Sequence, residues 1–174
     1  NPIKEIAEVV KKYPDVVFCV DTVSSMGGTS IPVDELGIDF CITSTQKCLG
    51  CPPGMSVASV SKKAYERAKT VPNRGLYLDI VEIYDKVVKD DKYQYPSTPS
   101  ESHMFALQEE LTYMLEVEGL ENRYARHLEM AEYIRAWARK YFAIFSDERY
   151  LSPTLTTIKN TRGISVADLN KKLA

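Results

Sequence analysis

The sequence predicts an α/β fold, and three observations indicate it. Residues 16–20 form a continuous apolar run rich in β-branched residues, and a second candidate strand, 38–44, is built around the apolar stretch 40–42. Such runs are typical of strands buried on both faces, as in a parallel sheet under helices. Segments with apolar residues at helical spacing precede and follow them, and a polar residue stands close to the end of each run. Alternating strand and helix patterns of this kind favour the α/β class.

The expected elements follow in order along the chain. Asn1 and Pro2 are suited to the N-cap and first position of a helix, which we expect to reach about residue 12. Strands are then predicted at 16–20, 38–44 and 55–61, with a helical turn at 32–37 and a helix at 62–69. Helices are predicted at 77–88, from about 104 to Gly119, and at 120–141, followed by a strand at 153–160 and a helix at 165–173.

Composition excludes several classes of function. The 174 residues are 44% hydrophobic and 26% charged, and the formal net charge is -2, so no basic patch points to nucleic acid. No apolar run approaches the roughly 20 residues that a membrane span needs. Four cysteines in a chain of this size do not make a disulfide framework, so we expect a reducing, cytoplasmic compartment.

Three residues near the ends of the first two strands carry the chemical argument: Asp21, Val23 and Lys47. Ligands of open α/β sheets bind at the carboxyl ends of the strands, so Asp21 and Lys47 could face one crevice. A lysine amine can form a Schiff base with pyridoxal phosphate, and a carboxylate can hold the pyridine nitrogen protonated. A flat apolar side chain such as Val23 can pack on the ring. On these residues alone, solvated strand ends remain the commoner explanation.

Two separated motifs carry a family resemblance. "VDTVSSMGG" at 20–28, followed by "STQKCLGCPPG" at 44–54, resembles class V of the fold-type I pyridoxal-phosphate enzymes. More narrowly, it resembles the alanine–glyoxylate and serine–pyruvate aminotransferase group, with its archaeal-type aspartate aminotransferase relatives. "LGIDF", "YLDI" and "EGLENR" extend the resemblance over essentially the whole chain. It implies a mostly parallel sheet covered by helices.

The resemblance also implies a reaction. Lys47 matches the catalytic lysine that forms the Schiff base and shuttles a proton, Asp21 matches the partner of the pyridine nitrogen, and Val23 matches the residue packed on the ring. The implied enzyme is an aminotransferase that moves an amino group between a small amino acid and a 2-oxo acid. Alanine, serine or aspartate are the implied donors.

Three further cofactor positions follow from the same resemblance. Gln46 matches a position near the cofactor phosphate. Tyr95 and Thr98, in "YPSTPS", match phosphate ligands that the neighbouring subunit supplies in this family. The resemblance therefore implies a homodimer with shared active sites.

We expect this chain to be a central-to-C-terminal fragment that is inactive by itself. Residues 1–117 match the C-terminal part of the large cofactor-binding domain, and 118–174 match the beginning of a small C-terminal domain. The family's glycine-rich phosphate loop would precede Asn1, and its arginine for the substrate carboxylate would follow Ala174.

Two alternatives stay open. Cys48 and Cys51 have the C-x-x-C spacing of a redox pair or half of a metal site, which would make the chain a non-enzymatic module. The other two cysteines lie in expected strands, so we interpret the pair as structural and expect no metal site. A cysteine desulfurase-like lyase would share the fold, but that branch carries a histidine where this chain has Gln46.

Overall fold

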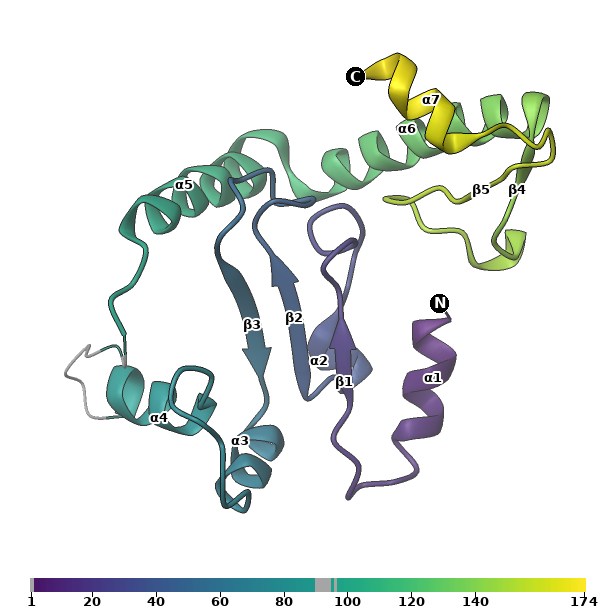
Figure 1. Ribbon diagram of the computed structural model, residues 1–174. Coiled ribbons are helices and arrows are strands. Elements are labelled where there is room, and N and C mark those ends of the chain that lie inside the picture. The colour runs from purple at the N-terminus through teal and green to yellow at the C-terminus, as the bar shows by residue number, and fades with distance from the viewer. Residues whose placement is uncertain (1, 90–94, 96) are drawn as a thin grey trace.

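A computed structural model describes residues 2–89, 95 and 97–174. Its centre is a three-stranded mixed sheet in the order β1-β2-β3 (Figure 1). The strands are β1 (Cys19–Asp21), β2 (Phe40–Ser44) and β3 (Ser56–Val60). β1 and β2 run parallel, and β2 and β3 run antiparallel. The α/β prediction is therefore confirmed, although the described sheet has one parallel and one antiparallel pair.

The best-buried apolar cluster lies beside β1 and β2. It joins residues from α1 (Ile3–Val10) and α2 (Val33–Leu36) to the strands, and its buried members are Ala7, Phe18, Leu36, Ile38 and Cys41. α1 is amphipathic and runs alongside β1 (Figure 1). This cluster stabilises the two strands whose ends carry the candidate catalytic residues.

A second group of helices follows β3. α3 (Lys62–Lys69) follows Ser61, whose side chain caps the helix by accepting from the Ala64 amide. α4 (Ile80–Tyr84) continues into the π-helical segment η1 (Asp85–Lys89). α5 (Glu101–Thr112) and the π-helical η2 (Tyr113–Glu118) then lead to Gly119. Gly119 has a φ of +78°, which ends this helical run as its position in the sequence predicted.

The last part of the chain is built on α6 (Leu120–Tyr141), which has 22 residues and extends away from the sheet (Figure 1). β4 (Ala143–Ile144) pairs antiparallel with β5 (Ile158–Lys159), with the 3-10 turn η3 (Glu148–Tyr150) between them and α7 (Val166–Leu173) after them. None of the helices in the described ranges is long and apolar enough to cross a lipid bilayer.

Several predicted boundaries were wrong for physical reasons. The first strand begins at Cys19, because the Phe18 amide donates to the Asp39 side chain. The helix predicted from residue 77 begins after Asp79, whose carboxylate caps the next helix by accepting from two backbone amides. The predicted strand at 153–160 is reduced to β5, and β4 was missed because two residues show no period.

Candidate active site

The two candidate catalytic residues follow neighbouring parallel strands. Cys19 pairs with Phe40 and Asp21 with Ile42, so β1 and β2 end at the same edge of the sheet. Asp21 is the last residue of β1, and Lys47 lies in the turn after β2. Both side chains are exposed. The predicted placement at one sheet edge is thereby observed, although Lys47 is not enclosed by the described residues.

The loop after Asp21 is held by a buried hydroxyl. Thr22 is 2% exposed, and its hydroxyl donates to the Ile42 carbonyl at 2.8 Å. The Thr22 carbonyl accepts from the amides of Ser25 and Met26, both at 2.9 Å. Asp21 Oδ1 accepts from the Val23 amide at 2.8 Å, while Oδ2 has no hydrogen bond to any residue that the structure describes. One carboxylate oxygen thus orients the side chain, and the other has no partner among the described residues and could meet a ligand.

The turn that carries Lys47 is closed by a second buried threonine. Thr45 is 0% exposed, and its hydroxyl lies 2.7 Å from the Pro52 carbonyl and 3.2 Å from that of Met55. The Gly50 amide donates to the Lys47 carbonyl at 2.9 Å, and Gly50 has a φ of +72°. This φ explains a glycine at that position. The Gly/Pro-rich sequence therefore folds back on the strand and leaves Lys47 at the surface.

The two loops touch each other through the glycine pair. A Cβ on Gly27, whose φ is +89°, would lie 3.2 Å from the Cys48 carbonyl oxygen. A Cβ on Gly28 would lie 2.9 Å from Cys48 Sγ and 2.4 Å from Thr154 Cγ2. Cys48 Sγ also donates to the Ser24 carbonyl at 3.6 Å. The chain next to Lys47 can therefore pack against the Asp21 loop only because both glycines lack side chains.

The two C-x-x-C thiols are in different surroundings. Cys48 Sγ contacts the Asp21 loop, whereas Cys51 Sγ lies 3.7 Å from the Ala106 carbonyl on α5. Burial raises the pKa of both thiols, against the lowering that a redox pair requires. Across the described residues, no group of three or more His, Cys, Asp or Glu side chains is arranged to hold a metal. The geometry favours structural thiols.

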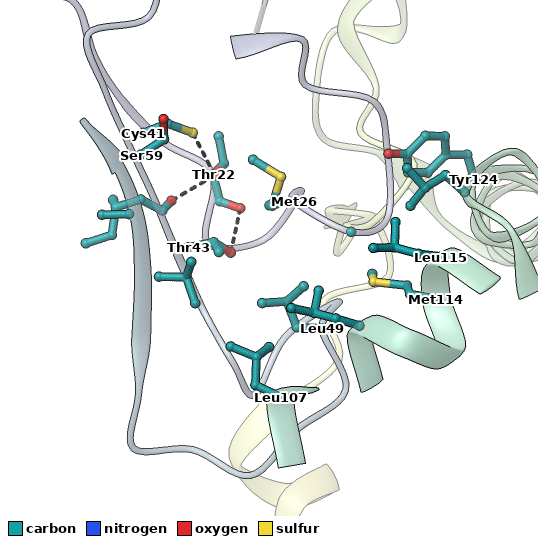
Figure 2. Close-up of a pocket in the computed structure, with 16 residues that line it drawn as sticks. Thr22, Met26, Cys41, Thr43, Leu49, Ser59, Leu107, Met114, Leu115 and Tyr124 are labelled. Carbon is teal, nitrogen blue, oxygen red and sulfur yellow. Dashed lines mark hydrogen bonds between the residues drawn. The ribbon is translucent and has the colours of Figure 1, made fainter. Parts of the chain in front are cut away.

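A mostly apolar hollow of about 300 Å³ lies beside these loops (Figure 2). Leu107, Met114 and Leu115 approach it from α5 and η2, opposite Thr22 and Thr43. Neither Asp21 nor Lys47 lines it. The hollow is therefore a gap in packing between the sheet and the helices, separate from the surface that carries the reactive groups. The apolar side chains predicted on one face of the 104–119 helix therefore point toward the sheet, and the hollow lies between them and the strands.

The remaining predicted cofactor residues are spread over three places. Val23 is half-buried beside Asp21, and Gln46 is exposed beside Lys47. Tyr95 and Thr98 are exposed and lie between η1 and α5. Thus four of the six predicted residues are brought together by the two loops, and Tyr95 and Thr98 stand apart from them in the chain. Their predicted role at a partner's phosphate stays a prediction.

One contributor was missed at the sequence level. Arg123 is 5% exposed and donates to the carbonyls of Gly27 at 3.1 Å and Cys48 at 2.7 Å. It also forms ion pairs with Glu110 and Glu118. "EGLENR" ends on this arginine, but helical spacing does not distinguish it from the exposed Arg126. The one feature of the sequence that could have indicated its role is its position one helical turn after Gly119, at the start of the predicted helix.

The fold thus places an aspartate and a lysine close to the carboxyl ends of two adjacent parallel strands. The Aminotransferase class-V family model matches residues 1–173. An uncharacterized aminotransferase of Methanocaldococcus jannaschii is 45% identical over 166 residues, covering 94% of this chain and 42% of that protein. The chain belongs to the class-V aminotransferase family.

Solved structures agree with this assignment. Alanine–glyoxylate aminotransferase from Nostoc sp. superposes with a TM-score of 0.88 at 28% identity, covering 99% of this chain and 45% of that one. Pyridoxamine–pyruvate aminotransferase from Mesorhizobium loti gives a TM-score of 0.87 at 31% identity, covering 97% and 43%. The fold-type I prediction is confirmed. The chain spans less than half the length of these relatives.

Proposed function

We propose that the protein to which this chain belongs is a pyridoxal-phosphate-dependent aminotransferase. It would exchange an amino group between a small amino acid (alanine, serine or aspartate) and a 2-oxo acid. The observation that carries the proposal is the placement of Asp21 and Lys47 on two touching loops at one sheet edge. The similarity to aminotransferases named for pyruvate and for glyoxylate supports a small 2-oxo acid as the acceptor.

The residues present fit the cofactor. Asp21 offers a carboxylate oxygen without a hydrogen bond to any described residue, and Lys47 offers an amine with no ion pair in the described part of the chain. The cofactor would supply an electron sink for charge developed at the substrate Cα. Asp21 would keep the ring nitrogen protonated, because a nearby negative charge favours the protonated form.

Lys47 would have two duties in this site. Its amine would hold the cofactor covalently at rest and then, once the amino donor has displaced it, move a proton from the substrate Cα. Lys47 lies within a closed turn and has no ion pair among the described residues, which suits both duties, since the base of the lysine is fixed while its amine can move. Val23 would pack on the ring, and Gln46 would lie near the phosphate.

We also propose the larger organisation. Residues 1–117 would complete the large domain and 118–174 would open the small one, with the break at the end of η2 before Gly119. Tyr95 and Thr98 would reach the phosphate held by a second copy of the chain, so the enzyme would be a homodimer.

The four described cysteines are unpaired, which fits the cytoplasmic location that the composition favours.

The test is Lys47→Ala in the full-length enzyme, with Lys12→Ala as the matched loss of an exposed lysine. We expect Lys47→Ala to abolish transamination and covalent attachment, because the covalent step has no substitute amine. Borohydride reduction followed by peptide mass spectrometry should place the cofactor on Lys47 in the wild type and in Lys12→Ala.

Near-wild-type turnover by Lys47→Ala would contradict the proposed role of the Lys47 amine in catalysis. The wild-type enzyme, given cysteine as the amino donor and pyruvate as the acceptor, tests the lyase alternative. Sulfide release without amino transfer would reassign the enzyme, whereas amino transfer without sulfide supports the aminotransferase.

A further inference from the structure

Arg123 connects both catalytic loops to the start of α6. Its Nε donates to the Gly27 carbonyl at 3.1 Å, in the loop that follows Asp21. One of its terminal nitrogens donates to the Cys48 carbonyl at 2.7 Å, next to Lys47. The planar guanidinium presents its donors in a fixed fork, so it holds two acceptors at a defined separation. The two loops are therefore joined through one rigid group.

Two carboxylates compensate the buried charge of this arginine. Glu110 accepts from Arg123 at 2.8 Å, and Glu118 accepts at 2.7 Å. A buried charge is stable only when it is paired and hydrogen-bonded, and here both conditions are met. Glu118 is shared with Arg126, whose Nε donates to its other oxygen at 2.7 Å. Four charged side chains thus form a balanced cluster behind the loops.

The packing of Gly27 supports the same conclusion independently. The position where its Cβ would lie is 3.2 Å from the Cys48 carbonyl oxygen and 3.2 Å from Met114 Cε. The carbonyls that Arg123 binds therefore come from two loops in direct contact. A shift of one loop would break this contact and the hydrogen bonds together.

We propose that Arg123 is a positioning residue for the reaction. By fixing the Gly27 and Cys48 carbonyls, it sets the separation between the Asp21 carboxylate and the Lys47 amine, and it does so without touching either. The inference rests on the proposed function, since only there must these two groups act on one cofactor. It also makes the start of α6 part of the active-site framework.

The experiment uses three variants of the full-length enzyme. Arg123→Met keeps the length of the side chain and removes the fork, and Arg123→Lys keeps the charge but cannot reach every acceptor. Arg126→Met is the matched control, because Arg126 pairs with the same Glu118 but is exposed and has no hydrogen bond to either loop in the described ranges. The first readout is amide hydrogen exchange in the cofactor-free protein, at Gly28 and Gly50.

We expect the Gly28 and Gly50 amides to exchange about tenfold faster or more in both Arg123 variants, the scale of one lost charge-assisted hydrogen bond per loop. The β2–β3 ladder, at Ala58, should exchange as in the wild type. A second readout is the pH titration of the bound cofactor's visible absorption, whose midpoint should move in the Arg123 variants and stay in place in Arg126→Met. If Arg123→Met does not fold, Arg123→Lys carries both readouts.

Wild-type exchange at Gly28 and Gly50 in a folded Arg123 variant would overturn the proposal. Equal effects of Arg126→Met and Arg123→Met would also overturn it, because the ion-pair cluster and not the carbonyl contacts would then be responsible. Exchange is measured without cofactor or substrate, so it stands whether or not Lys47 supports transamination. Failure of the positioning role and failure of the proposed function are therefore distinguishable.

Discussion

At the residue scale, neighbouring threonines and not the reactive side chains form most of the hydrogen bonds that hold the two loops in the described part of the chain. The buried hydroxyls of Thr22 and Thr45 occupy carbonyls of the adjoining strand and turn. Asp21 stands just before Thr22, and Lys47 stands two residues after Thr45. Among the described residues, the one hydrogen bond of either side chain within its loop is the bond from the Val23 amide to Asp21. This division lets a reactive group change its partner without loss of the fold.

The glycine pair leads to a prediction about stability. Gly28→Ala should lower the free energy of unfolding by about 1–3 kcal/mol, the usual cost of overpacking. The reason is that the new methyl group would lie 2.4 Å from Thr154 Cγ2 and 2.9 Å from Cys48 Sγ. Thr154→Ser removes the first of these atoms, so the double variant should recover part of the loss. Denaturant unfolding of the four proteins in the cycle measures the coupling.

Thr154→Ser alone serves as the control for this cycle. Strictly additive effects of Gly28→Ala and Thr154→Ser would contradict the contact, since residues that clash must show a coupling energy.

At the element scale, α6 joins regions that lie far apart in the sequence. Near its start, Arg123 reaches the catalytic loops, and further along Arg135 donates to the Ser152 carbonyl at 2.7 Å. Both arginines are buried, as few charged residues in the described ranges are. The helix therefore ties the sheet to the segment before β5.

His127, on the same helix, predicts a pH dependence. Burial, followed by the positive charges of Arg126 and Arg123, lowers its pKa from the ordinary 6.5, and Glu118 opposes this. Because the folded pKa is the lower one, the unfolded chain binds a proton that the folded chain does not, and stability falls as the pH drops below 6.5.

The variant His127→Gln should therefore lose less stability than the wild type between about pH 7.5 and 5.5. Thermal midpoints of the full-length protein across this range measure the difference. Parallel curves for the two proteins would show that His127 titrates alike in the folded and unfolded states.

At the scale of the whole molecule, the active site requires more than one chain if Tyr95 and Thr98 act on a partner's phosphate. A subunit carrying Tyr95→Phe and Thr98→Val would then spoil its partner's site, while Lys47→Ala spoils its own. A mixed dimer would contain one intact site and one site with both lesions. We expect activity to return when the two impaired full-length preparations are mixed, to about a quarter of the wild-type value for random exchange of equal amounts.

Subunit exchange itself is verified with differently tagged copies before the assay. No recovery under proven exchange would mean that this loop serves its own subunit or does not serve the cofactor. The Lys12→Ala protein, mixed with Lys47→Ala, controls for dilution of an active subunit.

The α/β class, the positions of most helices and the two motifs that contain Asp21 and Lys47 are all predicted from the amino-acid sequence. These features depend on local periodicity and on residues close together in the chain, so they can be predicted without coordinates. It also supported the family resemblance, because separated motifs occurred in one order.

How the two loops are held together depends on tertiary contacts that the sequence does not predict. The Arg123 contacts to Gly27 and Cys48 span 96 and 75 residues, and the role of Gly28 depends on Thr154. Phe18 lies outside the first strand because its amide donates to the side chain of Asp39, which is 21 residues further along the chain. Such contacts arise from packing between distant segments, which no local pattern in the sequence encodes.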